Sequence, residues 1–283
     1  MIRIPLMAVA SALALSLALP AAAQQGGPPI RTAVDGTFAP HAMPKLGGGV
    51  EGFQIDLFTE VAKRMKREIV IDSASFSGLI PAMNAGRYDF LAAPVTVTKE
   101  RTESLLFTEG YLFTEYQLLI RKGSPQVKGL DELKGKVISV NKGSAYDSWA
   151  RANAEKYGYE VQSFDTNTDA IQAVIAGRAY ANLAGNTVLA WAAKRNPQVE
   201  LSFALKETRA HWGAPFPKAS VDLRNQVEEV LECMKLDGTV AKLSEKWFGV
   251  APAADAAERT VFPGFGVPGL PGHDPAPHTP RCS

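Results

Sequence analysis

Residues 79–101, LIPAMNAGRYDFLAAPVTVTKER, hold the pattern that decides the fold. Within it, residues 79–96 read as a helical pattern that ends at Ala-Gly-Arg, then a short apolar strand pattern, and then small residues and Thr. Residues 169–187, DAIQAVIAGRAYANLAGNT, repeat the same order. An Ala-Gly-Arg helix end is common by itself, but a repeat of the whole order predicts two similar lobes.

The chain around these stretches alternates short apolar runs with helical patterns from residue 30 to residue 216, which is typical of α/β units with largely parallel sheets. Strands are predicted at residues 31–34, 69–73, 88–92, 137–140, 180–184 and 199–203. Two sets of apolar residues fall on single helical faces: Phe53, Leu57, Val61 and Met65, and then Ile171, Val174 and Ile175. Gly86 and Gly177 are expected to end helices.

Breaks in this pattern predict two crossings between the lobes. The extended stretch 113–120 leads into residues 121–125, RKGSP, where Gly and Pro end the strand pattern. A return crossing is expected near residues 208–212.

Residues 250–283 differ in composition, because Pro and Gly recur there and few residues could form a core. They are predicted to be a mostly disordered tail. Cys282 lies in this tail, and Cys233 lies in a helical pattern before it. In an exported chain a disulfide between the two is chemically permitted, but a buried thiol at Cys233 and a loose one at Cys282 fit the spacing equally.

The first 23 residues have the layout of a secretory signal, with Arg3, an apolar run from Leu6 to Leu19, and Pro20 before three alanines. Cleavage is expected after Ala23, because the run is shorter than the roughly 18 apolar residues that a membrane anchor needs. Removing Arg3 takes the formal charge from +1 to 0. The bulk charge therefore does not indicate nucleic acid or an anionic membrane as a partner.

Several common kinds of chemical site are not supported by the sequence. Residues 47–52, GGGVEG, match G-x-G-x-x-G, but Pro40 and Pro44 precede them where a dinucleotide site needs a strand, so a loop is predicted. The four histidines show no metal-ligand spacing, and there is no G-x-S-x-G motif. We therefore expect neither a metal nor a cofactor.

Thr98 and Arg101 are the clearest candidates for ligand chemistry. Thr98 can cap a short helix that follows a strand end, which would leave backbone N–H groups free to bind an anion. Arg101 could add a bidentate contact to a carboxylate, although a solvated surface Arg is the simpler interpretation of this residue alone. Together the two residues predict a preorganised site for a negatively charged group.

A series of short motifs extends along most of the chain: DGTFAP at 35–40, GFQIDL at 52–57, FSGLIPAM at 76–83, AGRYD at 85–89, TKER at 98–101, LKGKV at 133–137, GS at 143–144, DGT at 237–239 and KWFG at 246–249. Each motif is weak alone. In this order they resemble the extracellular solute-binding proteins of the polar amino-acid type, which serve ABC transporters. The resemblance runs from about residue 31 to residue 249.

This resemblance implies a periplasmic protein with the type 2 periplasmic-binding-protein fold, in which two α/β lobes are joined by two hinge crossings around an interlobe cleft. Lobe one would comprise residues 28–119 and 210–249, and lobe two residues 120–209. Hinge bending near Ile120 and Arg209 would close the lobes on an amino acid or related small carboxylate, and a membrane permease would recognise the closed form. The protein would act as a monomer.

The resemblance also assigns ligand contacts, with Arg101 and the backbone N–H of Thr96 holding the ligand α-carboxylate. The other assigned residues are Asp35 for a polar side chain, Phe38 and Phe76 for a sandwich around the ligand side chain, Ala93 and Pro94 for backbone contacts, and Asn141, Ser144 and Ala145 in the lobe-two loop that closes over the ligand. For Phe38 and Phe76 an ordinary core position is the alternative.

Gly185 is also placed at the ligand, and here the chain departs from the family pattern. After the strand at 180–184 the family usually has an Asp that pairs with the ligand α-ammonium. Leaving a buried ammonium unpaired is costly. Either Asp35, Asn182 or Asn186 compensates, or the ligand lacks a standard α-ammonium.

Two other function classes fit the same scaffold. A periplasmic enzyme, such as a cyclohexadienyl-type dehydratase, would need an acid or base in the cleft, and Glu51, Glu109 and Glu115 are available. A sensor module of a membrane receptor is less favoured, because the sequence shows no second membrane segment.

Overall fold

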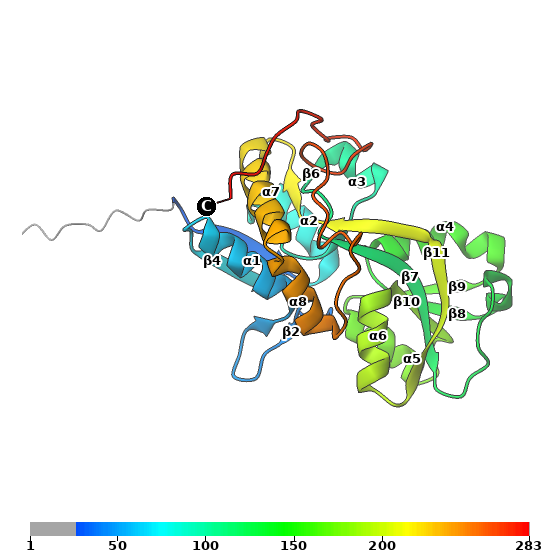
Figure 1. Ribbon diagram of the computed structural model, residues 1–283. Helices are drawn as coiled ribbons and strands as arrows, with labels where there is room; N and C mark the ends of the chain where they lie inside the picture. The colour runs from blue at the N-terminus through cyan, green and yellow to red at the C-terminus, as the bar shows by residue number, and fades with distance from the viewer. Residues whose placement is uncertain (1–26, 283) are drawn as a thin grey trace, which may run out of the picture.

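The computed structural model describes residues 27–282 and shows two lobes (Figure 1). The predicted secretory segment, residues 1–23, lies outside the described residues. Among the described helices, none combines the length and the apolar character that a membrane crossing requires.

Lobe one is built around two parallel strands, β1 (Ile30–Val34) and β4 (Ile69–Ser73). Its other elements are β2 (Met43–Pro44), β3 (Val50–Glu51), α1 (Phe53–Arg64), α2 (Phe76–Asn84), α3 (Lys99–Ser104), β6 (Leu105–Phe107), β12 (Pro215–Pro217), α7 (Val221–Leu236) and α8 (Thr239–Phe248). The predicted apolar face of α1 is buried at Phe53, Leu57 and Val61. The glycines at 47–49 form the turn of the β2–β3 hairpin, so they do not open a helix.

A sheet with the strand order β5-β11-β7-β10-β8-β9 continues from lobe one into lobe two. Its edge strand β5 (Val95–Thr96) belongs to lobe one, where it pairs with Trp212 and Gly213 at the end of β11. Lobe two contains the strands β8 (Val137–Asn141), β9 (Glu160–Phe164) and β10 (Ala181–Gly185), most of β7 (Leu112–Arg121) and β11 (Val199–Gly213), and the helices η1 (Leu130–Leu133), α4 (Ala145–Tyr157), α5 (Asn167–Ile175) and α6 (Asn186–Arg195). The strands β8, β9 and β10 are parallel, whereas β7 and β11 pair with their neighbours in antiparallel fashion.

The strands β7 and β11 run side by side from one lobe into the other (Figure 1). Residues 116–120 already pair with β10, so the chain leaves lobe one before them. The crossing between the lobes therefore lies before residues 121–125, where it was predicted. The strand β7 is continuous through the junction, so no break in the sequence pattern marks the crossing. In β11 the pairing slips between Leu205 and Ala210, beside the return crossing predicted near 208–212.

The predicted strands are present except for residues 88–92, which are irregular. These residues run beside β1, where the Asp89 N–H donates to the Arg31 carbonyl at 2.8 Å and the Ala93 N–H donates to the Ala33 carbonyl at 3.2 Å. Side chains supply further bonds between the two segments. The Asp89 carboxylate accepts the Arg31 backbone N–H at 2.8 Å. The Thr32 hydroxyl donates to the Phe90 carbonyl at 2.9 Å. The apolar run is buried as its composition predicts, and its backbone is satisfied partly by backbone groups and partly by polar side chains.

The tail differs most from its prediction. Its composition predicts disorder, but the structure holds residues 250–282 against lobe one in a largely irregular conformation. Ala257 and Glu258 are buried there, and Cys282 forms a disulfide with Cys233 of α7. Backbone hydrogen bonds and a covalent link to distant residues fix this segment, and neither requires an apolar core of its own.

Candidate functional site

Within the described part of the chain, four hydrogen bonds join the lobes directly and define a closed arrangement. They are Asn141 Nδ2 to Asp35 Oδ2 at 3.0 Å, Arg101 Nη2 to Gly143 O at 3.1 Å, His41 Nε2 with Thr187 Oγ1 at 2.8 Å, and Asn167 N to Thr37 Oγ1 at 3.2 Å. Gly143 also lies against Ser77 of α2, since a Cβ on this glycine would be 3.2 Å from the Ser77 Cα. The predicted site residues of the two lobes therefore meet at one seam.

Arg101 lies at this seam because the sequence starts a short helix just before it. Thr98 caps α3, its hydroxyl accepting the Arg101 backbone N–H at 3.3 Å. The guanidinium donates from Nη1 to the Thr96 carbonyl at 2.9 Å and from Nη2 to the Gly143 carbonyl. It also lies over the Phe76 ring, 5.8 Å from the centroid. Burial lowers the pKa of Arg101, but the group stays charged at any physiological pH.

The remaining lobe-one residues line the same side of the seam. Phe38, Phe76, Ala93 and Thr96 are all buried, as is Pro94. The Phe38 ring packs 6.1 Å from Trp212, and the Trp212 indole N–H donates to Thr96 Oγ1 at 3.1 Å. Both phenylalanines thus combine the predicted place at the seam with contacts in the core.

The lobe-two loop is preorganised by its own side chains. Ser144 caps α4, with Oγ accepting the Asp147 N–H at 3.1 Å and donating to the Asn141 carbonyl at 2.6 Å. Ala145 opens the helix behind it and is buried. Asp35 faces this loop, and both of its carboxylate oxygens accept hydrogen bonds, because Thr37 donates to Oδ1 from both N and Oγ1 while Asn141 donates to Oδ2.

The space next to the Cα of Gly185 is occupied by the side chain of Tyr146, a residue that no sequence pattern indicated. A Cβ at position 185 would lie 2.7 Å from Tyr146 Oη, 2.9 Å from Thr114 Oγ1 and 3.1 Å from Trp212 Cζ2. Tyr146 is buried, and burial raises the pKa of its hydroxyl, so it stays neutral. A phenol therefore occupies the space beside Gly185. The signal available in the sequence was its place two residues after Ser144 in the closing loop.

Two residues were named with Asp35 as possible compensators for the missing carboxylate. The Asn182 Nδ2 donates to the Ser139 carbonyl of β8 at 2.9 Å, whereas its buried Oδ1 has no partner among the described residues. Asn186 Oδ1 accepts the Glu115 backbone N–H at 3.4 Å.

A cavity of about 600 Å³ also lies between the lobes, away from Arg101. Its lining includes Pro40, Lys246, Trp247 and Phe248 from lobe one and Asn186, Thr187, Trp191, Lys194 and Arg195 from lobe two. The residues assigned to the ligand do not line this cavity.

Comparison with known proteins identifies the family. The model of bacterial extracellular solute-binding proteins, family 3, matches residues 30–250. The chain belongs to this family. The L-cystine-binding protein TcyJ of Escherichia coli (strain K12) is 28% identical to this solute-binding protein over 217 residues, which cover 76% of this chain and 81% of the relative.

Solved structures of the same kind share the fold of this solute-binding protein. An ancestral arginine-binding protein bound to arginine is 31% identical, with a TM-score of 0.75 over 80% of this chain and 100% of the other. An ancestral amino-acid-binding protein, AncCDT-1, described as a precursor of cyclohexadienyl dehydratase, is 28% identical, with a TM-score of 0.71 over 78% of this chain and 95% of the other. The predicted family and the two-lobed α/β fold are confirmed.

Proposed function

We propose that this protein captures an amino acid or a related small carboxylate between its lobes and delivers it to the permease of an ABC transporter. The observation that carries the proposal is the Arg101 guanidinium, which reaches one carbonyl of each lobe, that of Thr96 and that of Gly143. A guanidinium at such a seam can bind a carboxylate through two parallel hydrogen bonds. The cystine-binding and arginine-bound relatives support an amino acid as the ligand class.

In this proposal the lobes open, and Arg101 exchanges its carbonyl partners for the ligand carboxylate as they close. The Thr96 N–H adds a second donor, while Phe38 and Phe76 contact the ligand side chain and Ala93 and Pro94 contribute backbone groups. From lobe two, Asn141, Ser144 and Ala145 approach the ligand on closure. Contacts from both lobes to one ligand would stabilise the closed form.

We propose that this site differs from an ordinary amino-acid site in how it would contact the α-ammonium of a ligand. The space beside Gly185 is taken by the neutral Tyr146 hydroxyl, and Asp35 is already bound to Thr37 and Asn141. A buried ammonium would therefore lack a carboxylate partner at this point, which is unfavourable. We expect carboxylates without an α-ammonium to bind at least as tightly as the matching amino acids.

Isothermal titration calorimetry tests both statements. The panel contains amino acids, the matching 2-oxo acids, which lack the amine, and the matching amino-acid amides, which lack the carboxylate. Arg101→Ala should weaken binding by at least about 30-fold, because truncating a buried charged partner costs about 2 kcal/mol or more. Lys99→Ala is the matched control, since Lys99 is exposed at the start of the same helix. Preference for the amides, or unchanged affinity in Arg101→Ala, would refute the site.

We also propose that the protein binds its ligand without converting it. Of the acids available to an enzyme, Glu109 lies under the C-terminal segment and pairs with Lys235. Glu51 belongs to the β2–β3 hairpin, and Glu115 lies 3.9 Å from Arg209 at the lobe junction. Incubating the tightest ligand of the panel with the protein and following its concentration would separate the two functions. Multiple turnovers would establish an enzyme on this scaffold.

Export to the periplasm with cleavage after Ala23 is proposed from the secretory layout of the first 23 residues. Intact-mass measurement of the protein recovered from the periplasm tests the position. A mature chain that retains Arg3 would contradict it.

A further inference from the structure

The C-terminal strap, defined as residues 251–282, follows the part of the chain that matches the family. It leaves the end of α8, passes the lobe-one ends of β7 and β11, and returns along α7 (Figure 1). A segment with this course is in a position to act on both strands that connect the lobes.

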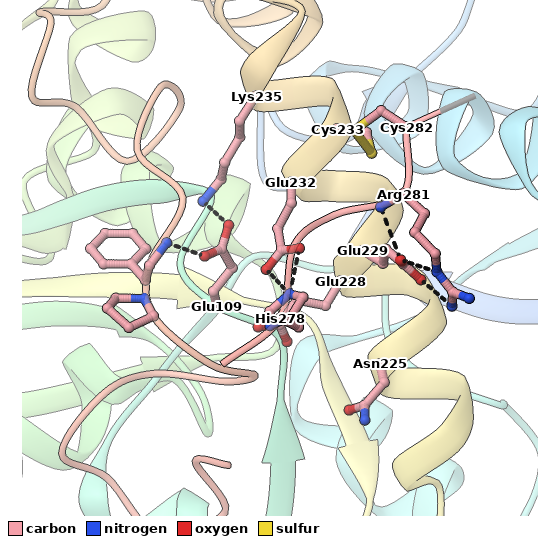
Figure 2. A network of polar contacts seen from close by, with 12 residues as sticks. Glu109, Asn225, Glu228, Glu229, Glu232, Cys233, Lys235, His278, Arg281 and Cys282 are labelled. Atoms are coloured by element: carbon pink, nitrogen blue, oxygen red, sulfur yellow. Dashed lines mark hydrogen bonds and ion pairs between the residues drawn. A yellow bond between two sulfur atoms is a disulfide. The ribbon is translucent and has the colours of Figure 1, made fainter. Parts of the chain in front are cut away.

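The strap contacts the approach to β7 through Glu109, which is fully buried. The Phe262 backbone N–H donates to this carboxylate at 2.7 Å. Lys235 of α7 pairs with the other carboxylate oxygen, as Figure 2 shows. The Lys235 ammonium also donates to the carbonyls of Gly110 at 2.6 Å and Thr260 at 2.8 Å. One buried ammonium thus joins the strap, α7 and the residues that lead into β7.

The strap contacts β11 through the Phe262 ring. This ring lies 5.0 Å from the ring of His211 in β11, and His211 lies 4.7 Å from Phe113 in β7. The other side of His211 is closed by Gly110, where a Cβ would collide with the imidazole. Phe262, His211 and Phe113 therefore form a cluster of tilted and edge-to-face rings that includes both connecting strands at the point where they leave lobe one.

Polar contacts and a disulfide fix the far end of the strap to α7 (Figure 2). The contacts are Gly266 N to Glu228 at 2.6 Å, His278 Nε2 with Glu232 at 2.8 Å, Arg281 Nε with Glu229 at 3.0 Å, and the disulfide between Cys282 and Cys233. Because the strap is tied at both ends, Phe262 belongs to a closed loop and is held near His211.

We propose that the strap is a hinge clamp, in which Phe262 positions the lobe-one ends of β7 and β11 and thereby favours the closed arrangement of the lobes. Hinge bending changes the backbone angles of a few residues where connecting strands leave a domain. A ring packed against those residues restricts that change. The inference rests on the hinge closure of the proposed function but not on the identity of the ligand.

The test compares Phe262→Ala with Phe265→Ala. Phe265 belongs to the same strap and is also half-buried, but its ring stacks on His278 at 3.9 Å. Spin labels on cysteines introduced at Leu46 of lobe one and Glu155 of lobe two, both exposed, report the distance between the lobes. The distances are measured by pulsed electron resonance on the full mature chain, first without added ligand and then with the tightest ligand of the panel.

In Phe262→Ala we expect the population at the longer distance to rise relative to the closed one, and the Kd to rise by about threefold or more as the competent fraction falls. Phe265→Ala should keep the wild-type distances and Kd. Identical distance distributions in the wild type and Phe262→Ala would overturn the clamp, and so would equal shifts in both variants. If no compound of the panel binds, the proposed function fails, whereas the distances without ligand still decide on the clamp.

Discussion

Gly185 has neighbours that leave no room for any side chain. Tyr146, Thr114 and Trp212 surround the position of its absent Cβ, the first of them at 2.7 Å, and all three are buried. Buried side chains in a close-packed interior give way only at a cost. We therefore predict that Gly185→Ala lowers the free energy of unfolding by about 1–3 kcal/mol, measured by urea denaturation.

Gly78 is the matched control for this substitution. It lies within α2, and a Cβ there would meet nothing within 4 Å. Gly78→Ala should raise the free energy of unfolding by about 0.5–1 kcal/mol, because Ala favours a helix over Gly. If Gly185→Ala were as stable as the wild type, Tyr146 would have to leave its place beside Gly185.

Tyr146 marks the limit of prediction at the residue scale. The sequence indicates that position 185 carries no carboxylate, because this is a property of one residue. The group that fills the space comes from the first turn of α4, whereas Gly185 ends β10, and no spacing rule relates Tyr146 to Gly185. By contrast, the cap of Thr98 on α3 was predictable, because it depends on residues that are neighbours in the chain.

At the scale of elements, α7 carries a group of buried acids beneath the strap. Burial raises the pKa of Glu232 to about 7, an effect that His278 opposes and Glu109 reinforces. Burial also raises the pKa of Glu228 well above its usual range, while Lys235 supplies the positive charge nearest to Glu109. A carboxyl whose pKa is higher in the folded chain stabilises the fold below about pH 4.5 and loses that contribution as the pH rises through 7.

We therefore predict that Glu232→Gln makes the free energy of unfolding less dependent on pH between about 4.5 and 7, by up to about 1.4 kcal/mol per pH unit. Urea denaturation at a series of pH values gives the slope. Glu229→Gln is the control on the same helix, since Arg281 lowers the pKa of Glu229 and its contribution has the opposite sign, being lost as the pH falls. A wild-type slope in Glu232→Gln would show that this carboxyl ionises normally in the folded chain.

The conformation of some elements follows from their own residues, whereas that of others depends on distant parts of the chain. The helix α1 and the strand β4 follow local apolar patterns, and the structure places them as those patterns predict. Residues 88–92 carry a strand pattern, but the side chains of Asp89 and the distant Thr32 supply part of their pairing with β1, beside a backbone hydrogen bond from Asp89 to Arg31. The strap has a composition typical of disorder, and its order depends on α7, to which no local pattern connects it.

At the scale of the whole molecule, the closed arrangement depends on polar contacts across the seam. His41 is fully buried, and its Nε2 meets Thr187 Oγ1 of lobe two at 2.8 Å. Burial lowers the pKa of His41 to about 3, so the imidazole is neutral at neutral pH, and Nδ1 has no partner among the described residues. Losing the Thr187 contact would leave both ring nitrogens unpaired in the closed form, whereas in an open form water can reach them.

Thr187→Val removes this contact with little change in shape, and its cost should fall on the closed form alone. We predict about tenfold weaker binding of the tightest ligand of the panel, since an unpaired buried group costs about 1–3 kcal/mol and each 1.4 kcal/mol is a factor of ten. Calorimetry measures the Kd, and urea denaturation without ligand checks that the fold is retained. Thr59→Val, on the exposed face of α1, makes the same chemical change away from the seam. Equal Kd values for the two variants would mean that the ligand-bound form does not use the His41–Thr187 contact.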